Sequence, residues 1–150
     1  MNVLPVPVAL LTTSVHGRWH GAIVQPTFCP TSRPPLMLVC LHRGTTIGAM
    51  IGQSHRFTLS FLGQQQGFLV ERFSRPRPAG AASFAGLQTR TDVTGSPYLA
   101  DAAAVARCRL LRTQSIGDHV LICGEVLASE VGQVEPLLYR AGSFWVTARL

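Results

Sequence analysis

The sequence predicts a mainly β fold, in which an antiparallel barrel carries two or three short helices. About seven or eight short runs of apolar and β-branched residues are separated by turn signals. Two stretches with helical spacing are short, and each directly follows a strand pattern. Strands and helices do not alternate as they do around a parallel α/β sheet, and no segment repeats. The 150 residues fit one domain, which we expect to span residues 1–150.

The first half of the chain contains strand patterns over residues 3–13, 20–25, 36–42 and 56–62. The first of these runs ends at a turn signal, His16–Gly17. Residues 27–35 hold too many prolines for regular structure. A helix should begin at Thr45 or Thr46, because either residue can serve as its N-cap and the apolar residues that follow share one helical face.

The second half begins with a short helix pattern over residues 64–73, which Gly67 weakens. Residues 74–82 are rich in proline and glycine and predict a loop. A half-buried strand follows, because Arg107 and Arg109 alternate with apolar residues. The strand patterns of this half span residues 105–112, 120–130, 136–140 and 143–146, the last two being joined by a turn at Ala141–Gly142.

The composition indicates an oligomer with an anionic partner. With 47% hydrophobic and 13% charged residues, a monomer would expose large apolar patches, so we expect a homo-oligomer. All 13 basic residues are arginine and the net charge is +6. The absence of lysine excludes Schiff-base chemistry and a P-loop lysine. Because the arginines are scattered and not interleaved with aromatic residues, a phosphorylated small molecule explains the charge at least as well as nucleic acid does.

The four cysteines, Cys29, Cys40, Cys108 and Cys123, show neither CxxC spacing nor a nearby histidine pair. We therefore predict no metal site and interpret them as buried free thiols. No stretch approaches the roughly 20 apolar residues that a membrane span requires. The apolar run near the N-terminus has no basic segment before it. We expect a soluble protein of the cytoplasm that makes no contact with a membrane.

Several segments occur in an order and spacing that together are specific. They are PVALLTT, HGAIVQPTFCPTSRPPLMLVCLHRGTT, RFTLSFL, SFAG, TGSPYL, CRLLRTQSIGDHVLICGEV and PLLYRAGSFW, and they extend over residues 7–145. In these segments the sequence resembles the flavin reductase family. The resemblance implies an FMN-binding split β-barrel of the Greek-key type with antiparallel strands.

The resemblance also implies an activity. The chain would be an NAD(P)H:flavin oxidoreductase that binds FMN, or FAD, and transfers hydride from NADH or NADPH to the flavin. It would form a homodimer and supply reduced flavin to a partner monooxygenase or another acceptor. The alternatives are an FMN-binding electron-transfer protein with little reductase activity, a barrel that binds another anionic cofactor or a nucleic acid, and an enzyme with a different reductant.

The segment Arg43-Gly44-Thr45-Thr46 is the candidate phosphate site. A helix N-terminus with free backbone N–H groups and a nearby cation can hold the phosphate of FMN. The resemblance favours phosphate contact by Thr45 or Thr46, with Arg43 beside them. Alternatively, Thr45 is only the N-cap of its helix.

The resemblance further implies that residues 25–31 lie along the flavin ring and ribityl chain, although they could also be a plain interstrand connection stiffened by proline. Relatives usually have small hydroxyl residues where Gln25-Pro26-Thr27 stand, and a lysine before the phenylalanine at Ser83-Phe84. Arg75 or Arg77 could supply the missing cation. The full set of predicted cofactor contacts is Gln25, Pro26, Thr27, Phe28, Cys29, Thr31, His42, Arg43, Thr45, Thr46, Ser60, Ser83 and Phe84.

His119, in the tripeptide Gly117-Asp118-His119, is the predicted catalytic residue. By resemblance, its imidazole reaches the flavin and the nicotinamide and orients the two rings for transfer. The alternative is a structural histidine beside a turn that Asp118 caps. Hydride transfer needs stacked rings and no acid or nucleophile from the protein, so the lack of a catalytic triad in the sequence fits this interpretation.

Overall fold

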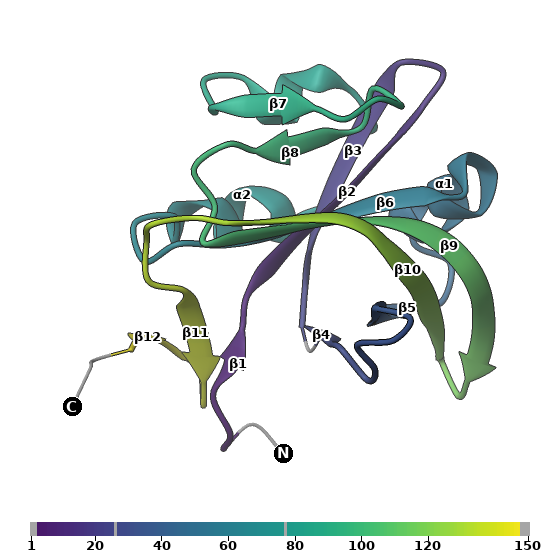
Figure 1. The fold of residues 1–150 in the computed structure, drawn as a ribbon. Coiled ribbons are helices and arrows are strands. Elements are labelled where there is room, and N and C mark those ends of the chain that lie inside the picture. Colours follow the sequence, from purple (N-terminus) through teal and green to yellow (C-terminus); the bar gives the residue numbers. More distant parts are fainter. Residues whose placement is uncertain (1–2, 26, 77, 148–150) are drawn as a thin grey trace.

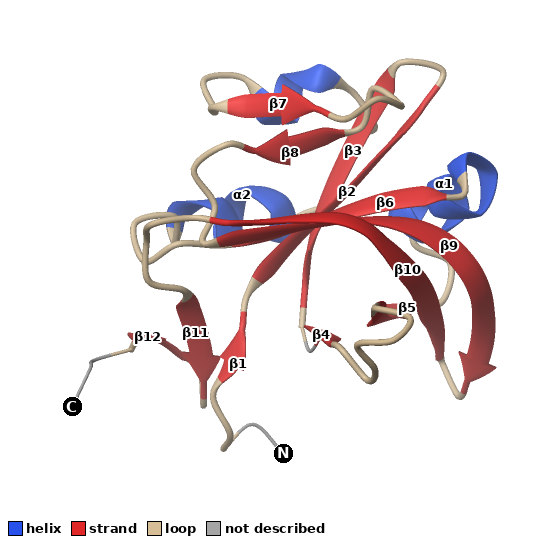
Figure 2. Cartoon of the chain, viewed as in Figure 1, coloured by secondary structure: helices blue, strands red, loops and turns tan. Residues whose placement is uncertain are grey.

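The computed structural model describes residues 3–25, 27–76 and 78–147. Strands dominate this part of the chain, which confirms the predicted mainly β fold with short helices (Figure 2). The strands are β1 (Val6–Pro7), β2 (Ala9–Val15), β3 (Arg18–Val24), β4 (Thr27–Phe28), β5 (Leu36–His42), β6 (Arg56–Phe61), β7 (Thr89–Thr91), β8 (Pro97–Leu99), β9 (Ala104–Ile116), β10 (His119–Val131), β11 (Leu137–Arg140) and β12 (Ser143–Val146). The helices are α1 (Thr46–Ser54), α2 (Phe68–Ser74) and the 3-10 helix η1 (Ala81–Phe84).

The main sheet has seven antiparallel strands in the order β3-β2-β6-β9-β10-β5-β4. Its long hairpin β9–β10 bends strongly, so the sheet curls (Figure 1). Register shifts in this hairpin, between Cys123 and Gly124 and between Val126 and Ala128, supply the local bend. Because β3 ends one side of the sheet and β5 with the short β4 ends the other, the curled sheet leaves a seam between β3 and β5.

Two hairpins turn where the sequence predicts turns. His16 and Gly17 join β2 to β3 with φ values of 50° and 74°, and Ala141 and Gly142 join β11 to β12 with φ values of 49° and 85°. Positive φ at both central residues is the type I′ pattern, whose twist matches that of the flanking strands. Both turns are confirmed.

Two clusters of buried side chains lie on the two faces of the sheet. Successive side chains of β2 point to opposite faces of the sheet, so Leu11 packs in one cluster and Leu10 in the other. The first cluster includes Ile47 and Ile51, which attach α1 to the barrel. The second includes Phe73 of α2. Each helix is therefore anchored by its apolar face, and each presents one end near the seam.

Some boundaries differ from the predicted ones. The predicted strand over residues 3–13 is two strands, because the backbone N–H of Val8 donates to Leu137 at 3.1 Å and directs β1 to a small sheet with β11 and β12. The predicted helix over residues 64–73 begins only at Phe68, since the Gln66 side chain accepts a hydrogen bond from the Gly63 N–H at 2.8 Å. Residues 27–35, expected to be irregular, contain the short strand β4.

Further differences concern the loop and the thiols. The predicted loop over residues 74–82 ends in η1. Cys108 and Cys123 are buried as predicted, Cys40 is half-buried, and Cys29 is exposed, so the prediction of buried thiols is wrong for Cys29. Proline-rich residues around Cys29 keep it outside the sheet.

Candidate functional site

A cavity of about 580 Å³ opens at the seam of the barrel. Strand β3 forms one side, the end of β5 and the start of α1 form the other, and the segment after α2 reaches the β3 side. The lining residues are His20, Gly21, Ala22, Ile23, Val24, Gln25, Cys40, Leu41, His42, Arg43, Gly44, Thr45, Thr46, Ile47, Phe73, Ser74, Arg75, Pro76 and His119.

The two strands present backbone groups to this cavity. Strand β3 pairs only with β2 in the sheet, and β4 covers β5 only at Leu38 and Val39. An edge strand leaves alternate N–H and C=O groups without a partner strand. The walls of the cavity therefore offer main-chain donors and acceptors that could hydrogen-bond the edge of a planar polar ring.

The N-terminus of α1 lies at the cavity. Gly44 has a φ of +82°, which a glycine adopts without steric cost, and it turns the chain from β5 into the helix. Thr45 is the N-cap, as predicted, and its hydroxyl accepts from the Gly48 N–H at 3.4 Å. The first turn carries no acidic residue. Its unpaired N–H groups and the positive end of the helix dipole favour an anion.

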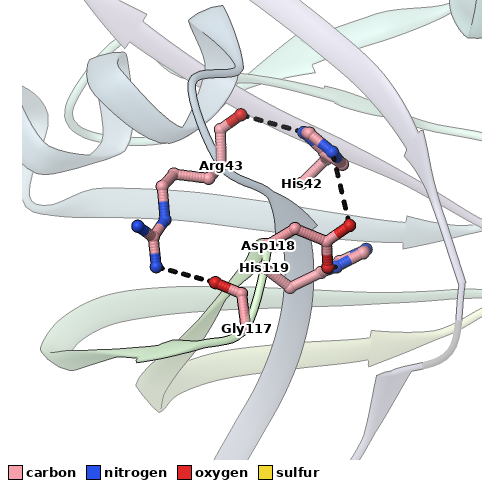
Figure 3. A network of polar contacts seen from close by, with 5 residues as sticks. All are labelled: His42, Arg43, Gly117, Asp118 and His119. Carbon is pink, nitrogen blue, oxygen red and sulfur yellow. Dashed lines mark hydrogen bonds and ion pairs between the residues drawn. The ribbon is translucent and has the colours of Figure 1, made fainter.

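Beside the helix, five residues form a polar network (Figure 3). His42 and His119 are register partners on β5 and β10, and their ring centroids are 5.3 Å apart. Asp118 accepts a hydrogen bond from Nδ1 of His119 at 2.7 Å, and it lies 3.7 Å from Nε2 of His42. The Arg43 guanidinium donates to the Gly117 carbonyl at 2.8 Å. The turn between β9 and β10 is thereby held against the segment of residues 43–46.

This network affects the charge of Asp118 and the orientation of the His119 ring. A hydrogen bond from His119 and the charge of that imidazole hold the pKa of Asp118 below its ordinary value, and His42 adds a smaller effect. Because Nδ1 of His119 donates to the carboxylate, the ring orientation is fixed and Nε2 is the nitrogen left for a ligand.

His20 is a lining residue that the sequence analysis missed. It is half-buried on β3, and burial lowers the pKa of its imidazole, which keeps the ring neutral near pH 7. Within the part of the chain that the structure describes, no aspartate or glutamate lines the cavity, whereas Arg43 and Arg75 do. No local pattern could have identified it, because consecutive residues of β3 line the cavity and their burial does not alternate.

The structure brings together six of the predicted site residues, which all line the cavity: Gln25, His42, Arg43, Thr45, Thr46 and His119. Arg75, suggested as a substitute cation, also lines it. Pro26 and Arg77 lie outside the described residues. The remaining predicted contacts, Thr27, Phe28, Cys29, Thr31, Ser60, Ser83 and Phe84, are not among the lining residues.

Structural roles account for several of these seven residues. Ser60 is fully buried, and its hydroxyl accepts from the Leu99 N–H at 3.1 Å, which ties β8 to the sheet. Phe84 is buried against Phe73 and Trp19. The Thr31 hydroxyl donates to the Pro34 carbonyl at 3.1 Å inside its own loop. In this structure their side chains serve packing and loop geometry.

The fold and the site define a class, namely antiparallel split barrels with a cavity at the seam beside a helix N-terminus. The family model for the flavin reductase like domain matches residues 1–147. The chain belongs to this family, which confirms the resemblance stated from the sequence.

Individual relatives agree with this assignment. The reductase component of a 4-nitrophenol 4-monooxygenase/4-nitrocatechol 2-monooxygenase from Rhodococcus opacus is 31% identical over 137 residues, which cover 91% of this chain and 72% of that protein. An NADH:riboflavin 5′-phosphate oxidoreductase from Streptomyces pristinaespiralis is 31% identical over 148 residues, covering 96% and 82%. The structure of nitrilotriacetate monooxygenase component B from Mycobacterium thermoresistibile has a TM-score of 0.89 at 26% identity, covering 97% and 81%.

Two features are absent from the part of the chain that the structure describes. No group of three or more histidine, cysteine, aspartate or glutamate residues there could hold a metal ion. None of the helices in the described ranges is long and apolar enough to cross a membrane.

Proposed function

We propose that this protein is a flavin reductase that binds FMN at the seam of the barrel, oxidises NADH and delivers reduced flavin to a partner monooxygenase. The observation that carries the proposal is the cavity itself. Its described lining combines a helix N-terminus, Arg43 and exposed strand edges, and it contains no carboxylate. A planar ring with a phosphate tail matches this combination better than a cationic or purely apolar ligand does.

The residues present fit FMN. A volume of about 580 Å³ lies within the roughly 300–1,000 Å³ typical of cofactor sites. The phosphate would lie at the N-terminus of α1, contacted by Thr45 or Thr46 and by Arg43. The edges of β3 and β5, from Gln25 on one side to Cys40 on the other, would hydrogen-bond the polar edge of the ring through the backbone.

Bound in this way, the flavin ring supplies the hydride acceptor, and the protein supplies binding and orientation. His119 contributes a positioned Nε2, because its other nitrogen is held by Asp118 at 2.7 Å. Apolar lining residues such as Ile23 and Leu41 exclude water from the ring. Arg43 has to exchange its contact with the Gly117 carbonyl for the phosphate, or to hold both at once.

We propose NADH as the reductant and FMN as the flavin because the S. pristinaespiralis relative bears both in its name. NADPH and FAD are the alternatives. The monooxygenase partner follows from the R. opacus relative, which is a reductase component.

The test is an absorption spectrum of the purified protein with and without FMN, followed by NADH oxidation with and without added FMN. We expect a flavin band and flavin-dependent oxidation of NADH. Bound flavin without NADH oxidation would instead support an electron-transfer protein. Failure to bind FMN or FAD would refute the proposal.

We further propose a homodimer in the cytoplasm. On β12, Phe144, Trp145 and Val146 are 46%, 50% and 52% exposed, an apolar group that a second copy would cover. Four free cysteines are typical of a reducing compartment. Light scattering coupled to gel filtration tests the dimer, and a monomer at micromolar concentration would contradict it.

A further inference from the structure

Two arginines line the cavity from different sides of the seam. Arg43 lies between β5 and α1, whereas Arg75 follows the last residue of α2, and α2 packs on β3. The two guanidinium groups therefore lie on opposite sides of the cavity, Arg43 on the side of β5 and α1 and Arg75 on the side of β3 and α2.

The phosphate of FMN requires only the first of these sites. The N-terminus of α1 and Arg43 supply backbone donors and a charge at one place. Arg75 is a second positive charge, on the β3 side, and its present partner is Glu71. The other titratable residue there, His20, is neutral near pH 7 because burial lowers its pKa. A second anionic group in the same cavity would meet Arg75.

The present partner of Arg75 is one that an anion can replace. Its guanidinium donates to the Glu71 carboxylate at 2.8 Å, one helical turn away. Both side chains are largely exposed, at 71% and 78%. An exposed pair of this kind is weak and screened by salt, so a phosphate can replace Glu71 at small cost. Phosphate oxygens also match the fork of the guanidinium.

We infer that Arg75 binds the pyrophosphate of a dinucleotide that occupies the β3 side of this cavity. The inference rests on the proposed function and adds a residue to it. A nicotinamide dinucleotide bound beside FMN and a flavin dinucleotide bound in place of FMN both carry this group. Arg75 would therefore determine how strongly the site favours dinucleotides over mononucleotides.

The experiment compares Arg75→Gln with a matched control, Arg90→Gln. Arg90 is an exposed arginine on β7 that does not line the cavity, so its replacement removes the same charge elsewhere. KM and kcat for NADH are measured at saturating FMN, and Kd values for FMN and FAD are measured by flavin fluorescence without turnover. Because both side chains are exposed, both variants should fold.

If the dinucleotide is NADH, Arg75→Gln should raise its KM about tenfold, the effect of losing one charge-assisted hydrogen bond, with kcat and the Kd of FMN unchanged. If it is FAD, the Kd of FAD should rise by the same factor while that of FMN stays constant. Glu71→Gln removes the carboxylate that holds the guanidinium. It should therefore lower the KM of NADH or the Kd of FAD, whichever Arg75→Gln raises, about twofold. Arg90→Gln should change none of these values.

Two results would overturn the inference while leaving the proposed function intact. One is an active wild-type enzyme in which Arg75→Gln and Arg90→Gln behave alike. The other is an equal loss of FMN and FAD affinity in Arg75→Gln, which would assign Arg75 to the phosphate of the mononucleotide. A wild-type protein that binds neither flavin and does not oxidise NADH would refute both proposals.

Discussion

Replacing Thr45 by valine separates the two roles that its hydroxyl could have. The side chain caps α1 by accepting from the Gly48 N–H, and it also lines the cavity, where its hydroxyl hydrogen can donate to a phosphate. Valine keeps the shape and removes both interactions. Loss of an N-cap costs about 1 kcal/mol, which corresponds to a fall in Tm of roughly 2–4 °C for a chain of this size.

Flavin affinity gives the second and independent readout. A hydrogen bond to a charged group contributes about 1.5–3 kcal/mol, so its loss should raise the Kd of FMN roughly ten- to a hundredfold. Affinity is measured by titrating FMN and following the quenching of its fluorescence, and Tm is measured on the flavin-free protein. Thr45→Ser, which keeps the hydroxyl, should preserve both values within about twofold in Kd and 1 °C in Tm.

One outcome would refute the reasoning on phosphate binding. If Thr45→Val lowers Tm as expected but leaves the Kd of FMN unchanged, Thr45 acts only as an N-cap. The same titration on Thr46→Val then shows whether the neighbouring hydroxyl makes the contact, since Thr46 also lines the cavity and is not the cap.

Three further perturbations test the core, the polar network and the thiols. Gly124→Ala should destabilise the fold by about 1–3 kcal/mol in denaturant unfolding, because a Cβ there would collide with the buried ring of Phe57. Asp118→Asn should flatten the dependence of Tm on pH below about pH 4. The reason is that His119 lowers the pKa of Asp118 in the folded protein. The carboxylate therefore contributes stability above its unfolded pKa, and this stability is lost as the pH falls through the folded pKa. Cys108 should resist a thiol reagent at pH 8, because burial raises the pKa of its thiol to about 12.

Each of these three predictions has a control measurement whose result could contradict it. Gly52→Ala, at an exposed position of α1 with open space around the added methyl group, should stabilise the protein by about 0.5–1 kcal/mol. Equal unfolding curves for Gly52→Ala and Gly124→Ala would disprove the packing argument. An acid-side fall in Tm that persists in Asp118→Asn would assign that fall to other carboxylates. Exposed Cys29 should react readily, and equal labelling of Cys29 and Cys108 would contradict the burial argument.

Local chemistry made much of the fold predictable from the sequence. The N-cap at Thr45 and the turns at residues 16–17 and 141–142 follow from short-range rules about hydroxyl groups and glycine, and the structure places all three where those rules do. The strand over residues 36–42 is likewise found, and its alternate residues Met37, Val39 and Leu41 belong to the core. Such features depend on a few neighbouring residues.

The site was less predictable, since it depends on which elements meet at the seam. Ser60 and Phe84 appear as cofactor contacts by resemblance, yet their side chains pack inside the protein. His20 lines the cavity although a histidine on a short strand carries no signal of its own. Its place follows from β3 being the last strand of a curled sheet, which is a long-range property of the pairing order.

The register between β5 and β10 joins the two parts of the site. His42 pairs with His119, so both rings stand on one face at the end of their strands, next to the start of α1. A slip of one residue would move one ring to the opposite face and separate Asp118 from residues 43–46. The turn residue Gly117, with a φ of +57°, and the contact of its carbonyl with Arg43 oppose such a slip. The guanidinium that we propose to meet the phosphate therefore also contacts the turn before His119, so under the proposed function phosphate binding and ring orientation would be coupled through Arg43.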